Sequence, residues 1–273
     1  MKDLLRRIRK FYSDLIDYFI RLIQRKTYLP PRSLRAFVGP QINLLDYEAT
    51  GKEFFGYFRE LCDLRQTESI LDVGCGCGQK TLPLLGYIKK DGHYWGTDLS
   101  KRAIIWCQRN ITRKYPQFEF YHVDLFNSVY NPKGTYLAEK YRFPFKDQSF
   151  DFILLVSVFT HMLPNGVENY FKEIARLLKD EGRAFITFFL LNDEQQQLAE
   201  KKLNTIDFKF EHEIYRTTSE DFPESAIAYK ENYVLGLISK NDVKLKIPIK
   251  YGNWSGRTDG LSYQDIVVVS RKI

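Results

Sequence analysis

Apolar and polar positions alternate with a helical period over the first 26 residues. Leu4, Ile8, Leu15 and Leu22 recur at three- and four-residue steps with aromatic residues among them, and basic residues lie largely between. This pattern predicts one amphipathic helix over residues 1–26, which Pro30-Pro31 ends. Charges interrupt its apolar run, so we expect neither a transmembrane span nor a signal peptide.

Strand and helix patterns then alternate along the chain. A helix is predicted at 45–64, followed by strands at 69–73, 93–97, 118–123, 150–156 and 183–191 and helices at 79–89, 101–114 and 167–178. A helix at about 224–239 precedes strands at 243–250 and 265–270, which a glycine-rich turn joins as a hairpin.

Alternation at this spacing predicts parallel βαβ units. The expected fold is α/β: a doubly wound, mostly parallel seven-stranded sheet with an antiparallel C-terminal hairpin, preceded by an N-terminal amphipathic helix. We divide the chain into a basic helical arm, residues 1–38, and a main domain, residues 39–273, with a substrate-side insert at about 191–223.

The net charge of +7 belongs to the arm. Residues 1–38 hold ten of the 41 basic residues and three of the 34 acidic ones, so the remainder carries 31 of each sign. A main domain without net charge is not expected to bind nucleic acid. For residues 1–26 two interpretations stay open: packing on the main domain or on a second subunit, or contact with an anionic membrane surface or partner.

Residues 69–78 run a buried strand into a turn with glycines at 74, 76 and 78. Glycine permits positive φ angles and close approach of a ligand to the backbone. The G-x-G-x-G spacing differs from the dinucleotide pattern, and Asp72, two residues earlier, would repel a pyrophosphate but suit a cationic ligand such as an α-ammonium group.

The four cysteines lie in or beside predicted buried or turn segments: Cys62, Cys75, Cys77 and Cys107. They lack metal-ligand spacing, and no histidine cluster completes a zinc site. We expect reduced thiols in a cytoplasmic protein and no metal.

The stretch Ile70-Leu-Asp-Val-Gly-Cys-Gly76 resembles the first motif of class I S-adenosylmethionine-dependent methyltransferases. Residues 93–98 and 120–125 resemble that family's second and third strands, and residues 143–151 and 177–183 resemble later elements. The resemblance covers about residues 45–191. It implies that Asp98 holds the ribose hydroxyls, that Asp124 receives the adenine amino group, and that the Leu125 amide meets a ring nitrogen. The implied cofactor is S-adenosylmethionine, with these candidate binding residues: Asp72, Gly74, Gly76, Gly78, Asp98, Leu99, Asp124, Leu125 and Ser157.

The fourth strand runs into Ser157-Val-Phe-Thr-His161. The carboxyl ends of the strands face the ligand crevice in this architecture, so His161 is expected beside the transferred methyl group. Histidine suits removal of a hydroxyl proton at neutral pH, which makes His161 the candidate general base; a helix cap or a structural turn is the alternative. No Asn/Asp-Pro-Pro-aromatic motif of nitrogen methylation occurs. The stretch resembles a bacterial group of methyltransferases associated with glycan biosynthesis.

We therefore predict methyl transfer to a hydroxyl oxygen of a glycan or glycolipid precursor, in the cytoplasm or peripherally at the inner membrane face. The alternatives are a small natural product or quinone-like lipid as acceptor, and a non-catalytic cofactor-binding subunit that docks through its N-terminal helix. The predicted partners are a small-molecule or glycan acceptor, no nucleic acid, and a membrane or second subunit at residues 1–26. Candidate acceptor-binding residues are His212, Tyr215, Tyr251 and Trp254, while surface solvation is favoured for Arg257.

Overall fold

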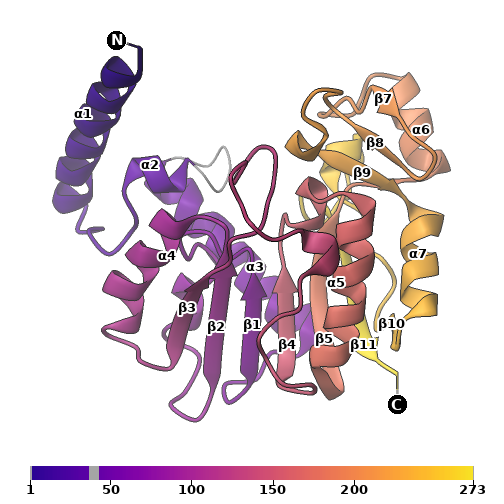
Figure 1. The fold of residues 1–273 in the computed structure, drawn as a ribbon, viewed down its shortest axis with the longest axis horizontal. Coiled ribbons are helices and arrows are strands. Elements are labelled where there is room, and N and C mark those ends of the chain that lie inside the picture. Colours follow the sequence, from indigo (N-terminus) through magenta and orange to yellow (C-terminus); the bar gives the residue numbers. More distant parts are fainter. Residues whose placement is uncertain (1, 37–42, 273) are drawn as a thin grey trace.

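One seven-stranded sheet carries the main domain, in the order β10-β11-β5-β4-β1-β2-β3 (Figure 1). The computed structural model describes residues 2–36 and 43–272. The parallel strands are β1 (Ser69–Val73), β2 (His93–Asp98), β3 (Phe118–His122), β4 (Phe150–Leu155) and β5 (Leu178–Phe188). β11 (Asp265–Arg271) runs antiparallel beside β5, and β10 (Val243–Leu245) runs antiparallel to β11. The predicted fold class is confirmed.

Side chains of the central strands alternate between two buried cores. On β1, Ile70 joins a core with α3 (Leu44–Cys62) and α4 (Lys101–Cys107), whereas Leu71 joins a core with α5 (Pro164–Leu177) and α7 (Glu231–Lys240). Phe152 and Ile153 on β4 divide in the same way. Helices thus cover both faces, which explains why these strands are mostly apolar.

Two of the predicted helices differ from the structure. Residues 79–89 form turns around a short 3-10 helix, Leu82–Leu84, because Pro83 has no N–H to continue an α-helical ladder. The predicted helix at 224–239 begins only at Glu231, because residues 227–230 pair with a neighbouring strand. The helix predicted at 101–114 is α4 followed by a π-helical turn, Gln108–Thr112.

The predicted insert contains helix α6 (Asp193–Glu200) and part of a second sheet, in the order β6-β9-β8-β7. Its strands are β6 (Leu190–Leu191), β7 (Phe210–Glu211), β8 (Tyr215–Thr217) and β9 (Ile227–Lys230). The strand predicted at 183–191 is therefore divided between β5 and β6. This insert sheet rises beyond the carboxyl ends of the main strands (Figure 1).

The remaining short 3-10 helices lie in connections: Ala138–Lys140, Phe159–His161, Pro223–Ser225 and Asn253–Ser255. The strand predicted at 243–250 is shorter than expected, ending at Leu245, with one isolated bridge between Lys250 and Ile266.

The arm contains α1 (Lys2–Ile23) and α2 (Arg32–Arg35), so the predicted N-terminal helix is confirmed. α1 projects away from the main domain, and its most extensive contact is with α2 (Figure 1). α2 reaches the glycine turn, because the Cys77 thiol donates to the Leu34 carbonyl oxygen at 3.5 Å. No described helix is long and apolar enough to cross a membrane. The predicted boundary between residues 38 and 39 lies outside the described residues.

Candidate active site

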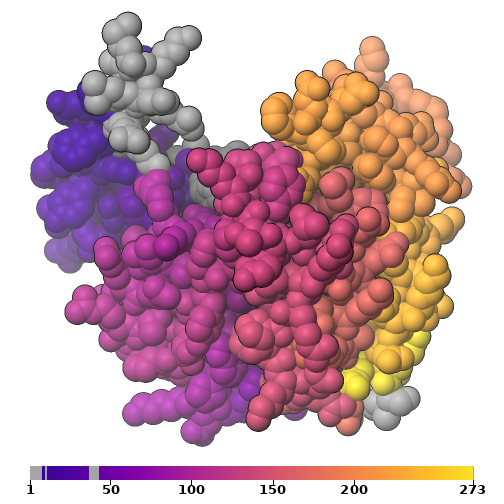
Figure 2. All heavy atoms as spheres, viewed as in Figure 1, coloured from indigo at the N-terminus to yellow at the C-terminus, as the bar shows by residue number. Residues whose placement is uncertain are grey.

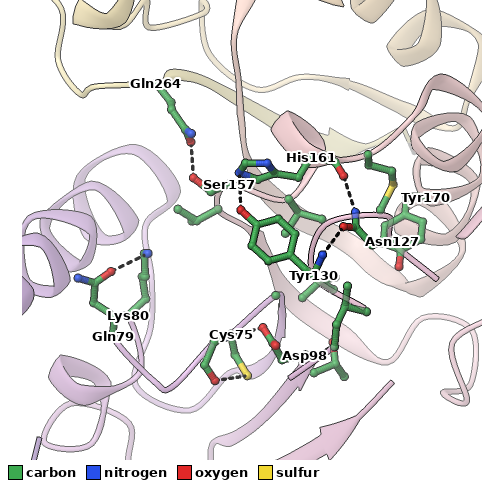
Figure 3. Close-up of a pocket in the computed structure, with 18 of the residues that line it drawn as sticks. Cys75, Gln79, Lys80, Asp98, Asn127, Tyr130, Ser157, His161, Tyr170 and Gln264 are labelled. Carbon is green, nitrogen blue, oxygen red and sulfur yellow. Dashed lines mark hydrogen bonds between the residues drawn. The ribbon is translucent and has the colours of Figure 1, made fainter. Parts of the chain in front are cut away.

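A cavity of about 760 Å³ lies at the carboxyl ends of the main strands (Figure 3). Its wall includes seven of the residues that the sequence nominates: Gly74, Gly76, Asp98, Leu99, Leu125, Ser157 and His161. They come from β1, β2, β3 and β4 or from the residues directly after them. A ligand crevice at this edge is what a doubly wound sheet provides, because the carboxyl ends of its strands meet there.

The backbone of the glycine turn after β1 packs closely against neighbouring groups. Gly74 has φ +76°, and a Cβ placed on it would lie 2.6 Å from Cγ2 of Val158. The N–H groups of Gly74 and Cys75 donate to the Thr97 carbonyl oxygen at 2.8 and 3.0 Å, which ties the turn to the end of β2. Gly78, at φ +81°, packs beside Ile111 and lies outside the cavity wall.

Asp98, the last residue of β2, is hydrogen-bonded to that turn. Its carboxylate accepts hydrogen bonds from the Gly76 N–H at 2.8 Å and the Ser100 N–H at 2.7 Å. Burial raises the pKa of Asp98, although the two N–H groups act in the opposite direction. A carboxylate fixed in this way at the cavity edge can accept two further hydroxyl hydrogen bonds, the geometry that a ribose requires.

Two other nominated acids lie outside the cavity wall. Asp72 is buried and accepts a hydrogen bond from the Tyr94 hydroxyl at 2.6 Å, and burial raises its pKa to about 6. Asp124 accepts from the Thr135 hydroxyl at 2.7 Å and the Asn131 amide at 3.1 Å, and these bonds lower its pKa. Asp72 therefore connects β1 to β2, and Asp124 holds the loop that follows β3.

Lys80 is a cavity residue that sequence reasoning missed. Its ammonium group donates to the Gln79 side-chain oxygen at 2.9 Å and lies 5.3 Å from the centre of the Phe54 ring (Figure 3). Burial lowers its pKa, while the nearby Asp72 acts to raise it. Its place directly after the glycines was a usable signal, but residues 79–89 were predicted only as a helix.

His161 ends the short 3-10 helix that follows β4. Its Nδ1 lies 3.1 Å from the Glu224 carbonyl oxygen, which can only accept, so Nδ1 carries the proton. Nε2 is then the basic nitrogen, and it lies 3.4 Å from the Tyr130 hydroxyl (Figure 3). Burial lowers the pKa of His161, so the ring is neutral at pH 7.

Three further cavity residues around this histidine were not nominated from the sequence: Asn127, Tyr130 and Glu224. The Asn127 amide donates to the His161 carbonyl oxygen and to the Glu224 carboxylate, both at 2.9 Å. The Ser128 N–H also donates to Glu224, at 2.6 Å. The loop after β3 and the segment before β9 are thereby joined into one wall behind the imidazole.

Comparison with known proteins identifies the domain. Residues 70–182 match the family model for a methyltransferase domain. Residues 70–182 therefore lie in an S-adenosylmethionine-dependent methyltransferase domain. Its cofactor is accordingly S-adenosylmethionine, and its Rossmann-like sheet is that of the family.

A curated relative of this methyltransferase domain is the tRNA N(3)-cytidine methyltransferase METTL2 of Gallus gallus. The two are 30% identical over 115 residues, which is 41% of this chain and 28% of that protein, so the chain spans little more than a quarter of its relative.

Solved structures share the fold. A protein from Pyrococcus horikoshii OT3 is 18% identical with a TM-score of 0.58, over 85% of this chain and 94% of the other. The 1,6-didemethyltoxoflavin-N1-methyltransferase of Burkholderia thailandensis, solved with bound 1,6-didemethyltoxoflavin and S-adenosylhomocysteine, is 14% identical with a TM-score of 0.51, over 83% of this chain and 80% of the other. At these identities the likeness concerns the fold alone.

On the side of the cavity formed with the C-terminal segment, Ser157 has φ 59° and its hydroxyl donates to the Gln264 side-chain oxygen at 2.9 Å. Thr187 donates to the same oxygen at 2.6 Å. Gln264 and the neighbouring Tyr263 line the cavity directly before β11. The C-terminal segment therefore contributes polar groups to the wall opposite the loop after β3.

The nominated acceptor-binding residues lie elsewhere. Trp254 is fully buried in an aromatic core, and its indole N–H donates to Asp265 at 2.8 Å, so it offers no stacking surface to a ligand. Tyr251 donates to Glu231. His212 and Tyr215 stack on one another at 4.3 Å between ring centres, at the insert sheet. None of these four lines the cavity.

Arg257 differs from the surface position favoured for it. It is 7% exposed, bonds to Glu194 and Ser255, and lies over the Tyr251 ring. Over residues 2–36 and 43–272, the structure contains no group of three or more His, Cys, Asp or Glu side chains that could hold a metal ion.

Proposed function

We propose that the methyltransferase domain methylates a hydroxyl oxygen and that His161 is its general base. The hydrogen bond from Nδ1 to the Glu224 carbonyl oxygen carries this proposal, because it fixes the tautomer that leaves Nε2 as a proton acceptor at the cavity wall. When bound, S-adenosylmethionine supplies an electrophilic methyl group. In the structure the Tyr130 hydroxyl donates to Nε2; on binding, the acceptor hydroxyl would take that place and give its proton to Nε2 as its oxygen takes the methyl group.

The residues present suit the cofactor. The glycine turn keeps its backbone at the cavity wall, where a Cβ on Gly74 would clash with Val158, and Asp98 offers a carboxylate to the ribose hydroxyls. Lys80 places a cation in the same cavity, where the cofactor's carboxylate would be its counter-ion. Leu99 and Leu125 supply apolar wall for the adenine. Asp72, Gly78 and Asp124 would act indirectly, by holding the turn and the loop in place.

The acceptor we propose is a glycan or glycolipid precursor at the cytoplasmic membrane face. Support comes from the resemblance of the Ser157–His161 stretch to glycan-associated methyltransferases and from the polar groups on the acceptor side, Ser157, Gln264 and Glu224. A small natural product or quinone-like lipid is the alternative acceptor. A non-catalytic subunit is the alternative from another class.

The test is transfer of labelled methyl from S-adenosylmethionine to a panel of sugar nucleotides, lipid-linked sugars, quinone-like lipids and tRNA, followed by location of the methylated atom. We expect label on oxygen of a sugar. Replacement H161A should lower kcat while leaving the affinity for S-adenosylhomocysteine unchanged, and H212A, at the stacked pair outside the cavity, is the matched control.

Label on nitrogen or on tRNA alone would overturn the proposal. Full activity of H161A would remove the histidine from the mechanism. Tight cofactor binding without transfer to any member of the panel or of a cell extract would favour the non-catalytic subunit.

A further inference from the structure

Helix α1 carries its apolar side chains outward. Ten of those with described side chains are between 40% and 81% exposed; Tyr18 and Ile20 lie at the flanks, and the other eight are Ile8, Phe11, Tyr12, Leu15, Ile16, Phe19, Leu22 and Ile23. These eight recur at three- and four-residue steps, so they share one side of the helix, which we call the outer stripe. Helices of globular domains ordinarily turn such a stripe towards the core. Figure 2 shows α1 at the margin of the molecule, on the side opposite the insert sheet.

The inner side of α1 is held by charge. Asp17 and Arg21 are 4% and 7% exposed, and Arg35 of α2 is 1% exposed. Arg35 bonds to the Asp17 carboxylate at 2.5 Å and Arg21 at 2.8 Å, and Arg21 also donates to the Leu29 carbonyl oxygen at 2.8 Å. We call Asp17, Arg21 and Arg35 the buried ion cluster.

The buried ion cluster fixes how the helix is rotated. One turn earlier, the Asp14 carboxylate accepts from the Ser33 N–H at 2.9 Å, on the same side. Rotating the outer stripe towards the main domain would expose or unpair charges that are now enclosed, which is strongly unfavourable. The stripe therefore stays outward, and a contiguous exposed apolar surface of this kind marks an interaction site.

The charge of residues 1–38 indicates what kind of partner covers the outer stripe. Of the ten basic and three acidic residues in 1–38, eight basic and two acidic ones lie outside the buried ion cluster. Arg9 and Arg25 are exposed on α1 and directly after it. A second copy of this chain would bring an equally basic arm against the first, whereas an anionic lipid surface complements both the charge and the apolar stripe.

We propose that the arm binds the protein peripherally to an anionic membrane surface, with the outer stripe of α1 in the interface and the basic side chains at the headgroups. This inference is independent of the acceptor's identity and of the catalytic role of His161.

The experiment is co-sedimentation of the full chain with vesicles of phosphatidylcholine, with and without phosphatidylglycerol, at low and high salt. We expect binding to the anionic vesicles that weakens with salt. I16E and F19E should each weaken binding by about tenfold or more, because each removes one fully inserted large apolar side chain. L245E on β10 is the matched control, since Leu245 is also exposed, at 37%, and it should bind like the unaltered protein.

Thermal unfolding and S-adenosylhomocysteine affinity of I16E and F19E should match the unaltered chain, which separates loss of docking from loss of fold. Absence of binding to anionic vesicles would overturn the proposal. So would a dimer in solution that F19E converts to a monomer, because the stripe would then be covered by a second copy. Equal binding of I16E and L245E would show that the stripe does not make the contact.

Discussion

Removal of the Asp98 carboxylate is the most direct test of the cofactor geometry. Asp98 is fixed by the N–H groups of Gly76 and Ser100 at 2.8 and 2.7 Å, with the carboxylate at the cavity wall. Loss of a charged hydrogen-bond partner costs on the order of 1–3 kcal/mol. At about 1.4 kcal/mol per tenfold change, D98A should raise the Kd for S-adenosylhomocysteine roughly 5- to 150-fold.

Isothermal titration of purified protein with S-adenosylhomocysteine measures this change. D124A is the informative companion, because the Asp124 carboxylate is bonded to Thr135 and Asn131 and lies outside the cavity wall. We expect D124A to raise Kd less than D98A does. Unaltered affinity of D98A would refute the ribose assignment. A loss in D124A as large as that in D98A would instead favour the direct adenine contact implied by the family resemblance.

Three further predictions concern the base, the tail and the turn. Because burial lowers the pKa of His161 from 6.5, the imidazole stays unprotonated to lower pH, and the acidic limb of kcat should have its midpoint below 6.5; a limb above that value would contradict the assignment. D265N should lower the free energy of unfolding in urea by about 1–3 kcal/mol, since its NH₂ group would face N–H donors now bonded to the carboxylate; an unchanged midpoint would count against this. G74A should weaken S-adenosylhomocysteine binding through the clash with Val158, whereas G56A, with nothing near the new methyl group, should not; similar affinities in calorimetry would remove the close-approach argument.

The sheet was predictable because short strand patterns alternate with helical ones and the strand centres are buried. β1, β2 and β4 begin and end within about two residues of the predicted bounds. The segment after the glycine turn was less predictable, since its apolar residues fit a helix while Pro83 restricts the ladder. Residues 227–230 were assigned to a helix because their pairing with β8 is tertiary information.

Contacts between residues that lie far apart in the chain could not be predicted from the sequence. Asn127 and Glu224 meet across 97 positions, and no local pattern announces their hydrogen bond. Trp254 could not be assigned from the sequence either. An aromatic residue in a glycine-rich turn can stack on a sugar or pack in a core, and the burial of Trp254 shows that it packs in a core. For the arm, periodicity identified the helix but not which side faces inward, because that depends on Asp17 meeting Arg35 from beyond the helix.

The thiol of Cys77 connects the arm to the glycine turn. Cys77 lies between Gly76 and Gly78 of the glycine turn. Its thiol donates to the Leu34 carbonyl oxygen of α2 and contacts the Tyr47 hydroxyl at 3.2 Å. The arm and the turn thus share one buried junction. Binding free energies are linked reciprocally, so any factor by which a lipid surface changes the affinity for S-adenosylmethionine is the factor by which the cofactor changes the affinity for lipid. Measuring the affinity for S-adenosylhomocysteine with and without anionic vesicles would give the size of this coupling.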